Sequence, residues 1–393
     1  MKKIALLLIC ISLMLSMASC EFFDKPGADG SDIPSTEDSI TNDASKTEDS
    51  ATNDSIVKDD SSEDEDEVTT SEPTEGIKYE LSSNGSFATV VGYEGTATDI
   101  HFLKEYEGAP VTKIGTNAFK ENKDITSVTI HNGIKEIEGW AFFECSSLTS
   151  LKFENGSTLT LIHQYVFQST ALSKLVIPES VTHIGALAFA GCLSLNSITV
   201  PSTTLIGDSA FYNTGYFNNE DNWDNGVLYI GTHLINVKLE YKGEVIVKEG
   251  TTTIAGSAFC YRQDVTRVVM PDSVVSISEM AFYYCTDLEE VVLSKNLAYI
   301  GFEAFYHGHI RGDFIIPKSV KTIEHSAFRY ASASRVFFEG TTDDWNNIYI
   351  GNFNDVFKYN QEFGWFYYYS ESAPSEGWKY WHYDESGNIV IWK

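Results

Sequence analysis

One short pattern recurs through this chain: an isoleucine followed five residues later by a phenylalanine. The pair occurs nine times, and successive phenylalanines mostly lie 22 to 25 residues apart, with one gap of 48 residues from Phe211 to Phe259. A fixed period in the twenties is typical of a solenoid, in which each repeat forms one coil and only stacking buries its apolar residues. The nine pairs are Ile114/Phe119, Ile137/Phe142, Ile162/Phe167, Ile184/Phe189, Ile206/Phe211, Ile254/Phe259, Ile277/Phe282, Ile300/Phe305 and Ile323/Phe328.

Most repeats carry a second apolar pair after the phenylalanine, as in Ile198/Val200. Two apolar residues separated by a single residue predict a short strand with one buried face. The intervening Ala-Phe step predicts a short helical or 3₁₀ turn on the opposite side of the coil. Proline, which cannot extend a β-ladder, follows four of these strands, at Pro178, Pro201, Pro271 and Pro317.

The repeat around Phe189 resembles the BspA-type, or Treponema pallidum-type, leucine-rich repeat. Val181-x-x-Ile184-Gly185-x-x-x-Phe189-x-x-Cys192 and Leu195-x-x-Ile198-x-Val200-Pro201 carry the match. The resemblance covers about residues 111–340. It implies a curved right-handed leucine-rich repeat solenoid of short parallel strands on the bacterial surface, with adhesion as its role. It implies no particular ligand.

The N-terminal residues predict export and anchoring. Residues 1–19 hold Lys2 and Lys3 before an apolar run too short to span a bilayer, which is typical of an export signal. Met17-Ala18-Ser19-Cys20 resembles a bacterial lipobox, which implies that Cys20 is lipidated and begins the mature chain. The alternative is ordinary cleavage with Cys20 incidental. Residues 20–76 predict an acidic disordered linker, because Glu21–Gly76 holds 19 acidic residues against three lysines.

Two segments flanking the repeats predict caps for the open ends of the solenoid. In residues 77–110, Asn84-Gly85 lies between strand-like runs and predicts a β-hairpin, with a third strand from Ile100 to Leu103. Residues 341–393 hold five of the seven tryptophans and predict an aromatic cap. The alternative is an aromatic platform for sugars or peptides, for which the candidates are Trp365, Trp378 and Trp381.

The 48-residue gap predicts an irregular coil at 212–250. Its Asn218–Gly226 stretch is rich in Asp and Asn, but the spacing of a calcium loop fails at Trp223. We therefore favour a polar loop over a calcium site.

No HExxH, GxSxG, P-loop or strand-linked GxGxxG motif occurs in the sequence. His307 and His309 form the one close histidine pair, which is weak as a metal site. The paired carboxylates of a glycoside hydrolase remain open, since acidic residues are abundant. A net charge of −29 argues against nucleic acid as a partner. We expect no enzyme activity, no cofactor and no metal.

Two smaller features leave alternatives open. Cys145, Cys192 and Cys285 share one repeat position and predict buried thiols, whereas Cys260 and Cys285, on adjacent coils, have the spacing to pair. The integrin-type tripeptide Arg311-Gly312-Asp313 stands at the start of a predicted strand, although an integrin ligand needs a protruding loop.

One outward position per coil lies between the buried strand residues, and four of the seven such residues are apolar. Contiguous exposed apolar residues mark interaction sites, although β-branched residues also simply suit strands. We expect the ligand surface on this stripe, chiefly at Val176, Thr199, Val269, Val292 and Ile315. The expected ligand is a host, matrix or neighbouring-cell protein; a glycan bound by the C-terminal aromatics is the alternative. The seven positions are Thr129, Lys152, Val176, Thr199, Val269, Val292 and Ile315.

Overall fold

The computed structural model describes residues 72–375 and 379–393, all of which belong to the compact unit Val68–Lys393. The predicted export signal at 1–19, the lipobox with Cys20 and nearly all of the predicted linker lie outside the described residues. Within the described ranges, no helix is both long enough and apolar enough to cross a membrane.

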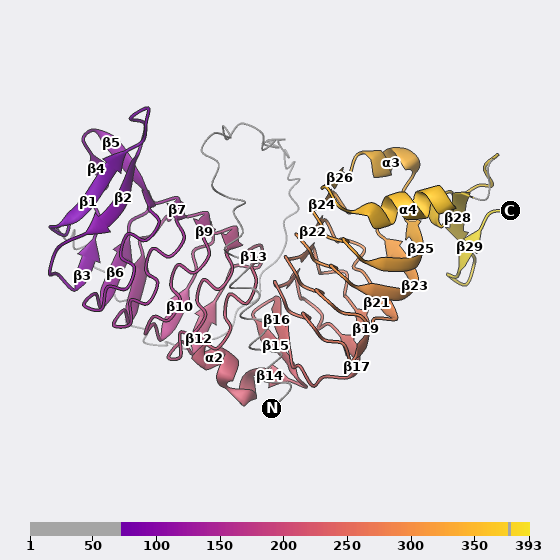
Figure 1. Cartoon of the computed structure of the whole chain (residues 1–393), viewed down its shortest axis with the longest axis horizontal. Helices are drawn as coiled ribbons and strands as arrows, with labels where there is room; N and C mark the ends of the chain where they lie inside the picture. The colour runs from indigo at the N-terminus through magenta and orange to yellow at the C-terminus, as the bar shows by residue number, and fades with distance from the viewer. Residues whose placement is uncertain (1–71, 376–378) are drawn as a thin grey trace, which may run out of the picture. The chain divides into compact units, whose positions relative to one another are not determined.

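Each coil contributes one short strand and one longer strand, and like strands of successive coils lie side by side (Figure 1). The short strands carry the recurring isoleucine and pair in parallel, so that Ile162 lies between Ile137 and Ile184. The short-strand ladders consist of β2 (Ala88–Tyr93), β5 (Ala109–Ile114), β7 (Glu136–Ile137), β9 (Leu161–Ile162), β11 (His183–Ile184) and β13 (Leu205–Ile206), then β16 (His233–Val237), β18 (Thr253–Ile254), β20 (Ser276–Ile277), β22 (Tyr299–Ile300), β24 (Thr322–Ile323) and β26 (Tyr349–Ile350).

The longer strands form the second set of parallel ladders. Most bury the apolar pair that the sequence predicts, as at Val128 and Ile130, which are 0% exposed, whereas Leu151, Phe153 and Ile198 are partly buried. These strands are β3 (Asp99–His101), β6 (Ser127–Ile130), β8 (Ser150–Phe153), β10 (Lys174–Val176), β12 (Ser197–Thr199), β17 (Gly243–Ile246), β19 (Val265–Val269), β21 (Glu290–Val292), β23 (His309–Ile316), β25 (Ser332–Phe338) and β27 (Phe366–Tyr369).

The Ala-Phe corner is a series of turns with the i→i−3 hydrogen bonds of the predicted 3₁₀ turn, but it contains left-handed residues that a regular 3₁₀ helix does not. In every repeat the residues two before and two after the phenylalanine have positive φ, as at Trp140 (58°) and Glu144 (54°) around Phe142. The i→i−3 bonds expected of a 3₁₀ turn are present, for example from the Cys145 N–H to the Phe142 carbonyl. A left-handed residue costs about 1–2 kcal/mol, and bonds between coils offset this, as from the Phe142 N–H to the Val166 carbonyl at 2.9 Å.

The phenylalanine rings stack in two separate ladders. Phe119 to Phe211 form the first, with neighbouring centroids 5.0, 5.2, 5.3 and 5.5 Å apart. Phe259 to Phe328 form the second, with spacings of 4.6, 4.8 and 4.9 Å. Stacking at this distance buries each ring. The aromatic pair interaction then adds to the stabilisation that comes from removing the ring from water.

The irregular coil separates these ladders. It holds α2 (Gly215–Asn218), the 3₁₀ turn η1 (Glu220–Asn222), β14 (Trp223–Asp224) and β15 (Val227–Ile230), and β14, β15 and β16 pair antiparallel. β16 and β17 then supply the two strands of one extra coil without a phenylalanine corner. On the corner side the flanking coils meet directly, because the Gly256 N–H donates to the Ile206 carbonyl at 2.8 Å.

The N-terminal flank contains the predicted hairpin, β1 (Ile77–Leu81) antiparallel to β2. β2 also pairs in parallel with β5, so the hairpin extends the short-strand ladder. β4 (Glu105–Tyr106) adds to β5. The expected third strand is β3, which joins β6 in the other sheet and not the hairpin.

The C-terminal flank holds α3 (Thr342–Asn346), α4 (Asp355–Phe363) and the antiparallel pair β28 (Tyr380–Tyr383) and β29 (Ile389–Ile391). Trp345 and Phe357 are buried against the core of the last coils, where Phe357 meets Phe328 edge to face at 5.0 Å. These rings cover the end of the second phenylalanine ladder.

Candidate functional site

The chief residues of the predicted ligand stripe lie on two separate stretches of the longer-strand ladders. Val176 pairs with Thr199 across β10 and β12, and both side chains are exposed, Val176 by 50%. Val269 pairs with Val292 across β19 and β21, where both are half-buried. Among the described strands, β12 and β17 do not pair. The five chief residues of the stripe therefore form two rows rather than one, and Thr129 and Lys152 belong to a third ladder on β6 and β8.

The second row is longer than the sequence predicts. Ile246 of β17 pairs with Val269 and is 70% exposed. At the other end, β23, which carries Ile315, lies beside β21, because the Gly312 N–H donates to the Glu289 carbonyl at 2.9 Å. Ile315 is half-buried because it packs against the C-terminal aromatic cluster. The open apolar row thus runs from Ile246 to Val292.

An ion-pair ladder runs beside this second row. Arg267 lies between Glu244 and Glu290 and contacts both carboxylates. Farther along, both Arg335 guanidinium contacts to the Asp313 carboxylate measure 2.7 Å. These charged side chains pair with one another within the sheet. The apolar row has no comparable partner there and stays open to solvent.

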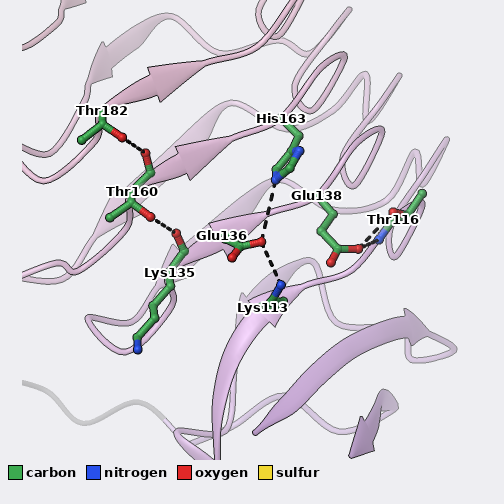
Figure 2. A network of polar contacts seen from close by, with 8 residues as sticks. All are labelled: Lys113, Thr116, Lys135, Glu136, Glu138, Thr160, His163 and Thr182. Carbon is green, nitrogen blue, oxygen red and sulfur yellow. Dashed lines mark hydrogen bonds and ion pairs between the residues drawn. The ribbon is translucent and has the colours of Figure 1, made fainter. Parts of the chain in front are cut away.

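The short-strand face of the N-terminal coils is polar (Figure 2). The Glu136 carboxylate lies 2.9 Å from the Lys113 ammonium and 3.8 Å from His163 Nε2. Nearby, the Thr182 hydroxyl donates to the Thr160 carbonyl of the preceding coil at 3.2 Å. Most of these side chains contact the neighbouring coil through a hydrogen bond or an ion pair, so this polar face stabilises the stack.

The three candidate tryptophans differ in accessibility. Trp365 is 51% exposed, just after the left-handed Gly364 that ends α4. Trp381 is 0% exposed and its Nε1–H donates to the Phe338 carbonyl at 3.0 Å. The expectation of a ligand-contacting Trp381 is therefore wrong, because β29 and the neighbouring aromatic rings enclose it. Trp378 lies outside the described residues.

Trp365 instead lines a groove beside the last coils, of ≈ 410 Å³, with Tyr330, Phe353 and Tyr359. These four rings are between 50% and 59% exposed. A second, more polar groove of ≈ 550 Å³ adjoins it, and Ser332 lines both. Volumes of several hundred Å³ are typical of ligand sites.

The sequence carries a signal for Tyr330 at the position two residues after the repeat phenylalanine, which the Ile-Phe pattern does not include. The residue two after the phenylalanine is polar or glycine in the first five repeats. In the last four it is an aromatic side chain or histidine, and these rings stack at 4.6–5.1 Å. The four residues are Tyr261, Tyr284, His307 and Tyr330.

Three carboxyl groups in the described residues have a raised pKa. Burial raises the pKa of Asp208 and of Glu279 above their ordinary values. Burial also raises the pKa of Glu303 to about 7, although the nearby Arg329 opposes this. Perturbed carboxyls can mark catalytic sites, but none of the three lines either groove.

The thiols of the repeats are buried and structural. Cys145, Cys192 and Cys285 are free, so Cys285 forms no disulfide with Cys260, which is also buried. Each of the three thiols donates to the phenylalanine carbonyl of the preceding coil, at 3.0–3.1 Å. Burial raises the pKa of Cys145 and Cys285 to about 12.

The Arg311-Gly312-Asp313 tripeptide lies within β23 and not on a protruding loop. Arg311 contacts Asp287 at 3.0 Å, and Asp313 is held by Arg335. Both charged groups are therefore engaged within the sheet. Among the described residues, no group of three or more His, Cys, Asp or Glu side chains is placed to hold a metal ion.

A comparison with protein families finds the same repeats that the structure shows. The model of the BspA type leucine rich repeat region matches residues 108–218 and 252–355 in six copies. The break between the two matches coincides with the irregular coil. In a comparison with curated proteins, none matches the chain.

Solved structures with a similar chain path are bacterial leucine-rich repeat proteins. The Treponema pallidum leucine rich repeat protein is 20% identical, with a TM-score of 0.37, 61% of this chain covered and 89% of that chain. A leucine rich cell surface protein of Faecalibacterium prausnitzii is 22% identical, with a TM-score of 0.30 and coverages of 71% and 97%. A leucine-rich repeat protein of Bacteroides ovatus is 20% identical, with a TM-score of 0.31 and coverages of 72% and 92%.

The family match spans more than half of the sequence, and the Ile-Phe coils it detects are those that stack in the structure. This chain belongs to the BspA-type leucine-rich repeat family.

Proposed function

We propose that this protein is a lipid-anchored protein of the bacterial cell surface whose repeat array binds an extracellular or cell-surface protein without catalysing a reaction. The lipobox-like Met17–Cys20 sequence supports the anchor. The acidic residues between Cys20 and the repeats support a spacer, since like charges repel and extend a chain. Anchor and spacer together present the repeat array away from the membrane.

The observation that carries the binding role is the open apolar row on the longer strands. Ile246, Val269 and Val292 occupy one position in three successive strands, and Ile246 is 70% exposed. Contiguous exposed apolar side chains rimmed by polar groups are typical of protein interaction surfaces. The ion-pair ladder beside the row forms that polar rim.

The charged groups favour binding over catalysis. A catalytic carboxyl needs a cleft in which it reaches substrate together with a second acid, base or nucleophile. Asp208 and Glu279 lie at the corner side of the array, and the hydrogen-bonding partner of the Glu279 carboxylate is the Asp208 backbone amide. They serve the contact between coils rather than a cleft.

The test compares two charge-matched triple variants of the full chain on an array of purified extracellular-matrix proteins. In the first, Ile246, Val269 and Val292 become Lys; in the second, Thr129, Val176 and Thr199 become Lys. We expect binding to be lost in the first variant and kept in the second. Ile315 is left unchanged because it packs against buried rings.

The melting temperature of each variant checks that the array is still folded. Loss of binding only in the second variant would move the site to the longer strands before the irregular coil. Binding that both folded variants retain would refute a strand-face site.

A further inference from the structure

Exposed aromatic rings gather on the C-terminal part of the solenoid, away from the strand row. Tyr330, Phe353, Tyr359 and Trp365 line one groove and are 56%, 50%, 59% and 51% exposed. They come from the last corner, the turn after β26, α4 and the residue before β27. Four large rings left open to solvent within one groove are unusual for a surface with no ligand.

The rings are held in place by contacts behind them. Trp365 stacks on Phe363 at 5.6 Å between centroids, and Phe363 stacks on Tyr359 at 6.5 Å. On the opposite wall, the Arg329 guanidinium lies 4.9 Å from the centroids of both Tyr330 and Phe353. Because neighbouring side chains restrict these rings, binding a ligand costs little further side-chain conformational entropy.

The adjoining groove is polar. Its floor carries His309, whose Nδ1 lies 2.7 Å from the Ser332 hydroxyl, and the ion pair of Arg311 with Asp287 at 3.0 Å. Ser332 lines both grooves, so the aromatic wall continues into this row of hydrogen-bonding groups. A ligand lying along both grooves meets flat apolar faces at one end and hydrogen-bond donors and acceptors at the other.

This combination fits the chemistry of a sugar. One face of a pyranose ring presents C–H groups that stack on an aromatic ring, and its edge presents hydroxyls that need hydrogen-bond partners. The charged residues in the two grooves balance, with Arg311 and Arg329 against Asp287 and Asp355. Balanced charge favours a neutral ligand over a polyanion or a polycation.

An extended peptide fits less well. Peptides that bind along a sheet add a strand at an open edge. β25, whose N-terminal residues line both grooves, is paired with β23 on one side, and on the other side with β27 from Val336 onward. The edge of β25 that β27 leaves open at the grooves is confined to residues 332–335, which is short for the addition of a strand.

We propose that the double groove lined by Tyr330, Phe353, Tyr359, Trp365 and the polar residues around Ser332 binds a neutral oligosaccharide. The site is separate from the strand row to which the proposed function is assigned. It gives the same surface protein a second ligand class, recognised by ring stacking and hydroxyl contacts.

The experiment is affinity electrophoresis of the full chain in gels that contain xyloglucan, galactomannan, mixed-linkage β-glucan or amylopectin. We expect at least one of these neutral polysaccharides to retard the protein. Trp365→Ala and Tyr359→Ala should each weaken the retarding interaction about tenfold, the effect of losing roughly 1.4 kcal/mol of stacking. Tyr349→Ala is the matched control, because Tyr349 is 61% exposed but lines neither groove.

Several results would overturn the proposal. These are no retardation by any of the four polysaccharides, retardation unchanged in both groove variants, or equal loss in Tyr349→Ala. Tighter binding of a proline-rich peptide or of heparin at the same groove would replace the neutral sugar by another ligand class. The strand-row triple-Lys variant should still be retarded, which separates this site from the proposed protein-binding surface.

Discussion

The backbone N–H of Asp208 donates a 2.8 Å hydrogen bond to the carboxylate of Glu279, a residue 71 positions later in the chain. Asp208 follows the last isoleucine before the irregular coil, and Glu279 lies in the second coil after it. The bond therefore joins the corners of the two phenylalanine ladders where the regular repeat is interrupted. Burial raises the pKa of both carboxyl groups, so each resists becoming charged at this junction.

Replacing Glu279 separates the roles of its hydrogen bond and its charge. Glu279→Gln keeps an oxygen to accept from the Asp208 N–H, so we expect its free energy of unfolding at pH 8 to equal or exceed that of the wild type. Glu279→Ala removes the acceptor and should lose about 1–2 kcal/mol. Urea unfolding of both variants measures the difference. A Gln variant as unstable as the Ala variant would show that the negative charge itself stabilises the junction.

The contribution of Glu303 to the stability of the array should fall as pH rises from about 5 to 8. Burial raises the pKa of Glu303 from 4.5 to about 7, so the folded state holds a proton that the unfolded chain releases near its ordinary pKa. The contribution is complete below pH 4.5 and is lost as pH rises through about 7. Because the side chain is only partly buried, we expect an effect of about 1–2 kcal/mol.

Glu303→Gln is the variant that isolates this dependence. Its melting temperature should exceed that of the wild type by more at pH 8 than at pH 5. Asp208 and Glu279 also have raised pKa values, so they too make stability fall as pH rises. The Glu303→Gln variant keeps this part of the pH dependence. Equal differences at the two pH values would mean that Glu303 titrates normally.

The second phenylalanine ladder should be sensitive to the loss of one ring. Phe282 is 0% exposed and stacks between Phe259 and Phe305 at 4.6 and 4.8 Å. Phe282→Ala should lower the free energy of unfolding by about 3–5 kcal/mol, because the neighbouring coils cannot close the space. The same change at Phe363, which is 63% exposed, should cost about 1 kcal/mol or less. Similar losses at both positions would contradict the ladder as the main source of stability.

The left-handed corners predict a stabilising substitution. Ser326 has a φ of 57° and is 1% exposed, and within the described part of the chain its hydroxyl has no hydrogen-bond partner. Ser326→Gly should raise the free energy of unfolding by about 0.5–1 kcal/mol. Glycine adopts this φ without strain, and the greater conformational freedom of glycine in the unfolded chain offsets part of that gain. Ser326→Ala removes the hydroxyl but keeps the left-handed cost, so chemical denaturation should rank it below the Gly variant. The reverse order would mean that the corners are unstrained.

The Ile-Phe period was sufficient to predict the solenoid and the buried isoleucines, because each repeat can bury its apolar residues only against its neighbours. The family resemblance implied the parallel strands. The same reasoning did not find the left-handed corners. Residues as different as Trp140, Leu187 and Met280 occupy them, so no residue preference marks the position in sequence. Bonds between stacked coils hold the corner, and these exist only once the stack has formed.

The candidate sites show the same division. Sequence alone placed the longer strands and named Trp365 as a candidate, because period and aromatic enrichment are local properties. It could not show that Trp381 is enclosed, that Ile246 extends the apolar row, or that Tyr330, Phe353 and Tyr359 share a groove with Trp365. Exposure and convergence depend on which coil each side chain meets, and the irregular coil and the C-terminal helices decide that through packing between segments far apart in the chain.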